Sequence, residues 1–184
     1  MRRAVIRSRR KLDYPGVQAM IDDGSATPDL QLLKEIGQLR QADARRRDAV
    51  DLPTPEQEVD TDGNLTYRAQ LPCKECNAQL SLLTGMAAAK VMLDGGVGLL
   101  RTLPAPDPQS VDSLRRSALA LGDVLSGLDP SQPAAAALLT LATRLLRGAV
   151  HTAFDGTLPE LHTHSAVAAP YAHCTAPLRR LADR

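Results

Sequence analysis

The sequence predicts an α+β domain that is mainly helical and carries a few short strands. Long segments repeat apolar residues at helical spacing, whereas the β-favouring stretches are short and bounded by proline or glycine. Only 2% of the 184 residues are aromatic, so leucine, valine and alanine must fill the core. That composition suits packed helices better than a sheet sandwich. The length corresponds to one domain or part of one.

The expected elements follow from periodicity and from the residues that bound each segment. In chain order they are a strand at 4–8 continued by Leu12 and Tyr14, helices at 17–22 and 28–48, strands at 56–60 and 65–71, helices at 77–93, 109–121 and 134–150, a buried strand at 166–170, and a last helix from Pro177. Pro15-Gly16 is expected to break the first strand. Thr27-Pro28 supplies an N-cap and a first-turn proline. Asp62-Gly63 indicates a hairpin turn of type I′.

The segment 77–93 has the strongest helical pattern of the chain. Leu82, Met86, Ala89 and Leu93 share one face, and neighbouring apolar residues widen that face, which predicts burial. Gly95-Gly96 ends the pattern, and prolines at 104, 106 and 108 then predict a rigid loop.

Basic residues collect at both ends of the chain, although the net charge is only +1. The first twelve residues include five arginines and one lysine without an acid, and Arg179, Arg180 and Arg184 close the chain. Two basic ends would suit a polyanion if they met in space. Two separately solvated basic ends are the alternative.

The cysteines give no disulfide framework. Three cysteines fit a reducing cytoplasm better than an oxidising compartment. Cys73 and Cys76 form a lone C-x-x-C pair, whereas a structural zinc site needs four ligands. We therefore assign no metal ligands in this chain. No window of about 18 apolar residues occurs, so no membrane association is expected.

Two other short patterns receive structural interpretations. His162-Thr163-His164 has no carboxylate at a convincing spacing, and we expect a surface loop there. Asp22-Asp23 precedes Gly24, which favours a turn at a helix end over a metal pair. The chain contains no phosphate-cradling glycine loop, no nucleophile elbow and no zinc-protease motif.

The run from Tyr171 to Asp183 is the strongest functional signal. It reads Y-A-H-C-T-A-P-L-R-R-L-A-D and predicts a helix that starts at Pro177. Arg179 and Arg180 then fall in the first turn, where the helix dipole disfavours cations. An anionic ligand near the free backbone N–H groups would offset that cost. An ordinary capped helix with exposed arginines is the alternative.

This run resembles the signature of the RNB exoribonucleases, the bacterial ribonucleases II and R, which reads approximately Y-x-H-x-T-S-P-I-R-R-Y-x-D. Ala176 and Leu181 replace the usual serine and tyrosine. The start of the chain, A-V-I-R-S with Leu12 and Tyr14, is similar to a second segment of that family. The order of the elements between the two segments also fits. The resemblance thus implies that residues 1–184 are part of an RNB catalytic domain.

The resemblance implies processive 3′-to-5′ hydrolysis of single-stranded RNA to nucleoside 5′-monophosphates, with Mg²⁺ held by a cluster of aspartates. It implies that Arg179 is the catalytic residue that clamps the phosphate. The residues implied to contact RNA or its phosphates are Arg180, Tyr171, His173, Thr175, Arg7, Ser8 and Tyr14.

The departures from the family pattern limit this expectation. The aspartate-rich motif of the family precedes the A-V-I-R-S segment, and we expect it to be absent here, as are cold-shock and S1 domains. Ala78-Gln79 stands where ribonuclease R-like members carry a glutamate pair. We therefore expect this chain alone to be inactive, with the aspartates either lost by truncation or carried by a separate polypeptide. A non-catalytic RNA-binding module and an inert fragment are the alternatives.

Overall fold

The computed structural model describes residues 5, 7–8, 10–121 and 129–176. In chain order the described elements are α1 (Tyr14–Asp22), α2 (Pro28–Arg46), β1 (Glu56–Val59), β2 (Leu65–Arg68), α3 (Pro72–Asp94), β3 (Val97–Thr102), α4 (Pro108–Leu121), α5 (Pro133–Arg144) and β4 (Val150–Asp155). Two antiparallel pairs, β1 with β2 and β3 with β4, form the sheets. The expected α+β, mainly helical class is confirmed.

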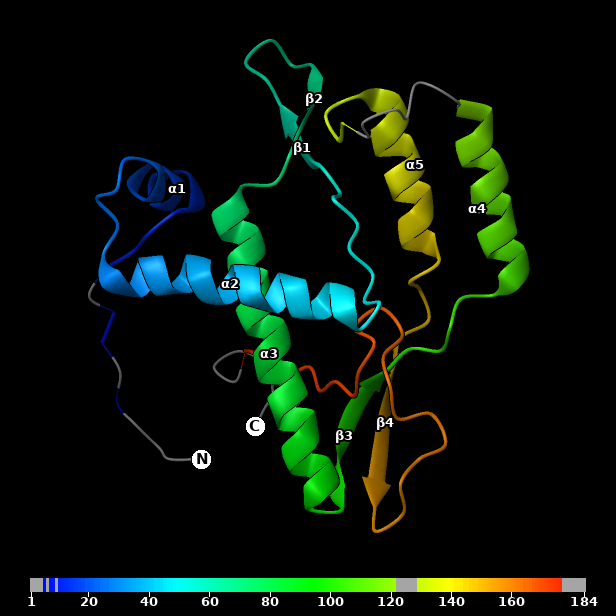
Figure 1. Cartoon of the computed structure of the whole chain (residues 1–184). Helices are drawn as coiled ribbons and strands as arrows, with labels where there is room; N and C mark the ends of the chain where they lie inside the picture. The colour runs from blue at the N-terminus through cyan, green and yellow to red at the C-terminus, as the bar shows by residue number, and fades with distance from the viewer. Residues whose placement is uncertain (1–4, 6, 9, 122–128, 177–184) are drawn as a thin grey trace.

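Helix α3 is the central element of the fold, and α2 crosses it near its N-terminal half (Figure 1). A Cβ atom on Gly37 of α2 would lie 2.4 Å from Cys76 Cβ and 2.6 Å from Cys76 Cα of α3. The two backbones can therefore approach this closely only because residue 37 is glycine. Helix α1 packs at the start of α3, where Gln18 accepts a hydrogen bond from Cys73 N at 2.9 Å.

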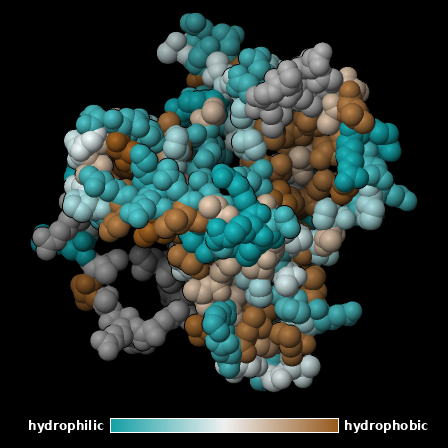
Figure 2. All heavy atoms as spheres, viewed as in Figure 1, coloured by the Kyte–Doolittle hydropathy of each residue, from teal (hydrophilic) through white to brown (hydrophobic). Residues whose placement is uncertain are grey.

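The core lies between the C-terminal half of α3 and the β3–β4 pair. Ala89 and Leu100 are fully buried and pack with Phe154 and Ala172. Leu99 faces Ala153 in the register of the pair. Helices α4 and α5 pack on each other. In Figure 2 hydrophobic side chains gather over α5, whereas hydrophilic ones cover α2.

The predicted N-terminal strand is wrong wherever its residues are described. Residues 5, 7–8 and 10–13 form no strand, and Tyr14 begins α1 instead of continuing one. Asp13 is the N-cap, and its carboxylate accepts a hydrogen bond from Gly16 N at 2.7 Å. Proline in the first turn favours a helix start, so Pro15-Gly16 begins the helix and does not break a strand.

Two predictions in the C-terminal third are also wrong. The helix expected at 134–150 ends at Arg144, and Val150 begins β4. The strand expected at 166–170 is a turn, which His164 N closes by donating to Ala169 O at 3.0 Å. Ala168 adopts φ 53°, which an extended strand excludes. The helix expected from Pro177 lies outside the described residues.

Several predicted elements are confirmed with shifted ends. The long helices begin at Pro28, Pro72 and Pro108, each in a first-turn position. The predicted hairpin is β1–β2, but its loop is residues 60–64 and not a two-residue turn, since Val59 pairs with Leu65. Asp60 holds the loop by accepting from Asp62 N and Asn64 N. Among the described helices, none is long and apolar enough to cross a membrane.

Candidate functional site

The C-terminal segment that carries the motif is held between α3 and β3. Tyr171 is buried, and its carbonyl accepts a hydrogen bond from Arg101 N of β3 at 2.7 Å. Ala172 N donates to Gly85 O of α3 at 3.0 Å. A Cβ on Gly85 would lie 2.1 Å from Tyr171 Cε2, so this glycine makes room for the ring. The first residues of the motif therefore have a defined position between Gly85 of α3 and Arg101 of β3, which we call the motif seat.

The side chains of the motif form an aromatic wall at that seat. The Tyr171 hydroxyl and His173 Nδ1 form a hydrogen bond of 3.0 Å, and His173 is exposed. His164 meets the Tyr171 ring edge-on, with centroids 5.8 Å apart. Burial, and then the positive charge of Arg101, lower the pKa of His164. His164 is thus a neutral packing partner of the tyrosine and not the surface histidine that the sequence predicts.

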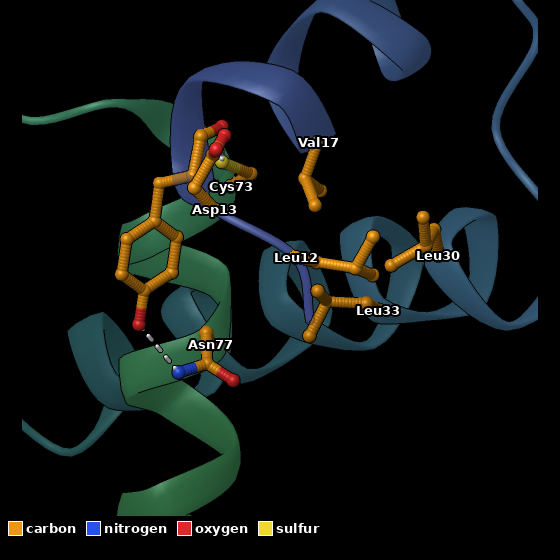
Figure 3. Close-up of a pocket in the computed structure, with 8 residues that line it drawn as sticks. Leu12, Asp13, Val17, Leu30, Leu33, Cys73 and Asn77 are labelled. Atoms are coloured by element: carbon orange, nitrogen blue, oxygen red, sulfur yellow. Dashed lines mark hydrogen bonds between the residues drawn. The ribbon is translucent and has the colours of Figure 1, made fainter. Parts of the chain in front are cut away.

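Tyr14, one of the predicted site residues, lines a pocket at the other end of α3 (Figure 3). The pocket measures about 320 Å³, and its walls are Leu12, Asp13, Tyr14, Val17, Leu30, Leu33, Cys73 and Asn77. Asn77 Nδ2 donates to the Tyr14 hydroxyl at 3.0 Å. Lys74 Nζ lies 5.8 Å from the Tyr14 ring centroid. Apolar walls with an aromatic ring and a few polar groups at the edge suit a flat, partly polar ligand.

The structure does not bring all predicted site residues together. Tyr14 contacts the first turns of α3 and Tyr171 contacts Gly85, and the twelve helical steps from Cys73 to Gly85 span about 18 Å of helix. Arg7 and Ser8 are exposed and Thr175 is half-buried. Arg179 and Arg180 lie outside the described residues, so whether the two basic ends meet stays a prediction.

The C-x-x-C pair packs helices together. Cys73 and Cys76 are buried in the first turn and a half of α3, and their thiols donate to Tyr14 O at 3.3 Å and Lys34 O at 3.7 Å. Burial raises the pKa of both thiols, which keeps them protonated. Within the described ranges, no group of three or more histidine, cysteine, aspartate or glutamate side chains could hold a metal ion.

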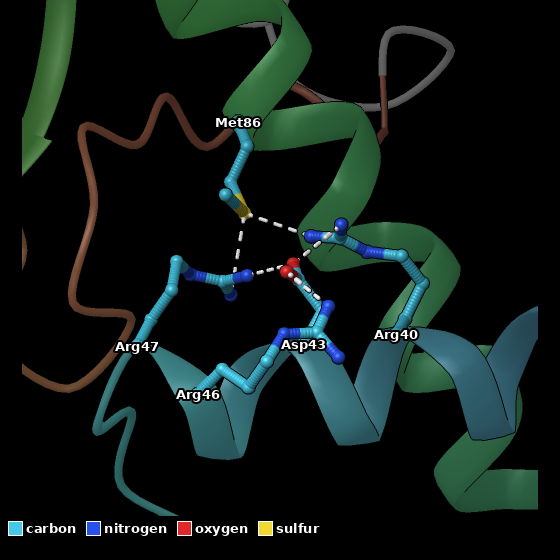
Figure 4. A network of polar contacts seen from close by, with 5 residues as sticks. All are labelled: Arg40, Asp43, Arg46, Arg47 and Met86. Carbon is cyan, nitrogen blue, oxygen red and sulfur yellow. Dashed lines mark hydrogen bonds and ion pairs between the residues drawn. The ribbon is translucent and has the colours of Figure 1, made fainter.

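A cluster of arginines at the end of α2 was not singled out from the sequence. Arg40 and Arg46 pair with Asp43 at 2.8 and 3.1 Å, and Arg47 contacts the same carboxylate (Figure 4). Burial raises the pKa of Asp43, but the three arginines outweigh it and hold that pKa below its usual value. In the sequence, the run Arg45-Arg46-Arg47 indicates only cations near the C-terminal end of a helix, where they suit the helix dipole. The spacing of Arg40 and Arg47 around Asp43, at i−3 and i+4, is the signal that could have found the cluster.

Comparisons with known proteins identify the family to which a chain with this fold and this C-terminal motif belongs. The RNB domain matches residues 1–184, the whole chain. The chain therefore belongs to the RNB domain family, and the resemblance seen in the two sequence segments is confirmed.

Two curated relatives are exonucleases. The chain is 27% identical over 210 residues to the exosome complex exonuclease RRP44 homolog A of Arabidopsis thaliana. It is also 27% identical over 207 residues to the exosome complex exonuclease RRP44 of Mus musculus. Each match covers 98% of this chain and 22% of the relative. The chain thus spans about a fifth of the length of these relatives.

Solved structures share the fold at low identity. Mycoplasma genitalium RNase R in complex with ribose methylated single-stranded RNA matches with a TM-score of 0.68 and 19% identity, over 92% of this chain and 30% of that one. Yeast Ssd1, described as a pseudonuclease, matches with a TM-score of 0.64 and 19% identity, over 94% of this chain and 24% of that one. Because a nuclease and a pseudonuclease both match, the fold alone does not decide catalysis.

Proposed function

We propose that this chain serves 3′-to-5′ exonucleolytic hydrolysis of single-stranded RNA to nucleoside 5′-monophosphates, and that it supplies the part that holds the RNA. The observation that carries the proposal is the seat of the motif. Tyr171 and Ala172 are fixed by β3 and α3, four residues before the sequence Pro177-Leu178-Arg179-Arg180. Positioning determines how well a phosphate is clamped, and a fixed start of the motif supports such a role for its two arginines.

The proposed roles follow from the charge of the substrate. Arg179 neutralises the negative charge that builds up on the scissile phosphate, and Arg180 contacts a neighbouring phosphate. Tyr171 and His173 are proposed to contact the same RNA strand, and the hydrogen bond between them sets the orientation of the exposed imidazole. Thr175 is assigned to the same contact.

Tyr14 and its pocket form the second proposed RNA contact. Its aromatic ring borders the leucine-lined pocket, and Lys74 is placed near the face of the same ring. A nucleobase could enter the pocket and stack on an aromatic face, an interaction that tolerates any base. Arg7 and Ser8, which are exposed and precede this pocket in sequence, would contact the backbone of the same strand.

The reaction implied by the family resemblance requires a metal ion. Mg²⁺ prefers carboxylate oxygens and serves such hydrolysis by activating water. The donor set of the described residues does not fit such an ion, since no suitable cluster occurs among them. We propose that the aspartates lie in another segment or on a separate polypeptide. A cytoplasmic location belongs to the same proposal, supported by the small, odd number of cysteines, three in 184 residues.

The first experiment separates RNA binding from hydrolysis. The 184-residue chain is incubated with Mg²⁺ and 5′-labelled oligo(A), and we expect salt-sensitive binding without shortening of the RNA. Metal-dependent release of mononucleotides would show that the chain is complete as a catalyst. Arg179→Ala with Arg180→Ala should weaken binding. Arg115→Ala with Arg116→Ala is the matched control, because it removes two adjacent exposed arginines from α4.

A non-catalytic RNA-binding role is the second candidate, since the same fold also occurs in the pseudonuclease Ssd1. The two candidates differ in what happens when the missing aspartates are supplied. Mixing the chain with the aspartate-bearing segment of an RNB nuclease should restore release of mononucleotides if the chain serves catalysis. Retained RNA binding without any hydrolysis in that mixture would favour the non-catalytic role.

A further inference from the structure

The arginine cluster of α2 carries more positive charge than its one acid compensates. Arg40, Arg46 and Arg47 converge on Asp43, so three guanidinium charges face a single carboxylate (Figure 4). The C-terminal end of a helix offers only about half a negative charge to the cations near it. Most of the excess charge within the cluster therefore remains.

The cluster also has more hydrogen-bond donors than acceptors. Arg40 Nη2 and Arg47 Nη2 point at Met86 Sδ of α3, at 3.3 and 3.8 Å, and a thioether is a weak acceptor. The Nε groups of Arg40 and Arg47 are buried and meet no acceptor in the described part of the chain. Buried polar groups are normally paired. Both guanidinium groups are thus held in place with unused donors.

The cluster remains open to an incoming ligand. The side chain of Arg46 is 71% exposed, whereas those of Arg40 and Arg47 are 20% and 23% exposed. Arg47 also lines a cavity of about 40 Å³ together with Val50 and Val167. A water molecule needs roughly 10–15 Å³ measured in this way, so Arg47 borders space that solvent can enter.

The position of the cluster connects it to the motif seat. Met86 is the residue after Gly85, which holds Tyr171 and Ala172. Val50, just beyond the cluster, donates its N–H to Ala166 O at 2.9 Å, and Ala166 lies five residues before Tyr171. A ligand on the arginines would therefore lie beside the segment that leads into the motif.

We propose that Arg40, Arg46 and Arg47 form a binding site for a phosphate group, which either the backbone of an RNA strand or free phosphate supplies. Phosphate oxygens are strong acceptors, and the planar guanidinium fork matches their geometry. Asp43 holds the three side chains at the correct spacing and limits the affinity. The RNA source rests on the proposed function, whereas the site itself does not.

Nuclear magnetic resonance of the arginine Nε–Hε groups tests the site directly. The ¹⁵N-labelled 184-residue chain is titrated with inorganic phosphate and, separately, with oligo(A), against sodium chloride of equal ionic strength. We expect saturable shifts of the Arg40 and Arg47 signals, assigned through Arg40→Gln and Arg47→Gln. Shifts identical to those in chloride overturn the proposal. Saturation by phosphate but not by oligo(A) supports free phosphate as the source.

Matched variants separate binding from stability. Arg46→Gln should weaken phosphate binding by about two- to fivefold and lower the salt slope of oligo(A) binding by about 0.7. Arg115→Gln should change neither, although Arg115 is equally exposed and also pairs with an aspartate at i−3. Asp43→Asn should tighten phosphate binding even if it lowers stability, whereas a purely structural cluster would only lose stability.

The outcomes distinguish this inference from the proposed function. If oligo(A) binds and Arg46→Gln behaves as Arg115→Gln does, the phosphate site is wrong and the RNA-holding role stands. If the chain binds phosphate through the arginines and no RNA at all, the site stands and the RNA-holding role is wrong.

Discussion

Gly85→Ala tests whether the seat of the motif depends on a single missing methyl group. The added Cβ would lie 2.1 Å from Tyr171 Cε2, 2.7 Å from Tyr171 Cδ2 and 2.6 Å from Ala172 O. Carbon atoms in contact normally stay about 3.5–4.0 Å apart. The ring would have to retreat by more than about 1 Å, and Ala172 could not keep its hydrogen bond to the backbone of residue 85.

The magnitude follows from opposing terms. Alanine in place of glycine in a helix interior contributes about 1 kcal/mol to stability. Overpacking costs about 1–3 kcal/mol, and loss of the Ala172 N–H to Gly85 O bond costs about 0.5–1.5 kcal/mol more. We therefore expect Gly85→Ala to lower the free energy of unfolding by about 0.5–3.5 kcal/mol, the opposite sign to a helix-propensity effect.

Urea unfolding measures this change, and a double-mutant cycle locates its cause. Tyr171→Ala removes the ring that the new methyl group would strike, so Gly85→Ala should cost less in that background. A Gly85→Ala variant that is as stable as the parent chain, or more so, would refute the steric argument. Equal costs in both backgrounds would show that the ring is not the obstacle.

Two further predictions concern buried titratable groups. Because the pKa of His164 is lowered on folding, stability should be complete above the ordinary histidine pKa and decline as the pH falls through it. Urea midpoints of unfolding measured from pH 7 to 5 report this decline, and His164→Gln should make it smaller. The control His151→Gln, at an exposed position, should show the same decline as the parent chain. Because burial raises the pKa of Cys73 and Cys76, both thiols should resist alkylation at pH 8 and react once urea unfolds the chain. Rapid native alkylation of either would contradict the packing described.

Elements with local signals could be predicted from the sequence, and elements made by distant pairing could not. Helix α3 has a long run of apolar residues that ends at a glycine, and the β1–β2 hairpin has turn residues between its strands. Strands β3 and β4 depend on pairs such as Thr102 with Thr152, fifty positions apart. Val150 continues a helical pattern in sequence, but its backbone joins β4 because β3 provides the hydrogen-bonding partner.

The same distinction applies to the candidate site: local sequence predicts some of its residues, and contacts between distant segments determine the others. The order of residues in the C-terminal run located Tyr171 and His173, and their contact is direct. His164 could not be assigned to the same wall, because its contact with Tyr171 requires the turn at 164–169. The arginine cluster could not be predicted as a site, because it also includes contacts with Met86, which lies 46 positions from Arg40 and 39 from Arg47.

Helix α3 links the features from which function is inferred. Asn77 reaches the Tyr14 pocket, Gly85 holds the motif, and Met86 faces the arginine cluster. From Asn77 to Gly85 the helix advances about 12 Å, so a rigid element sets the spacing between the proposed contacts. A scaffold that fixes contacts in this way can serve a nuclease or a protein that only binds. Loss of catalytic residues therefore need not alter this part of the fold, which is consistent with its occurrence in both RNase R and the pseudonuclease Ssd1.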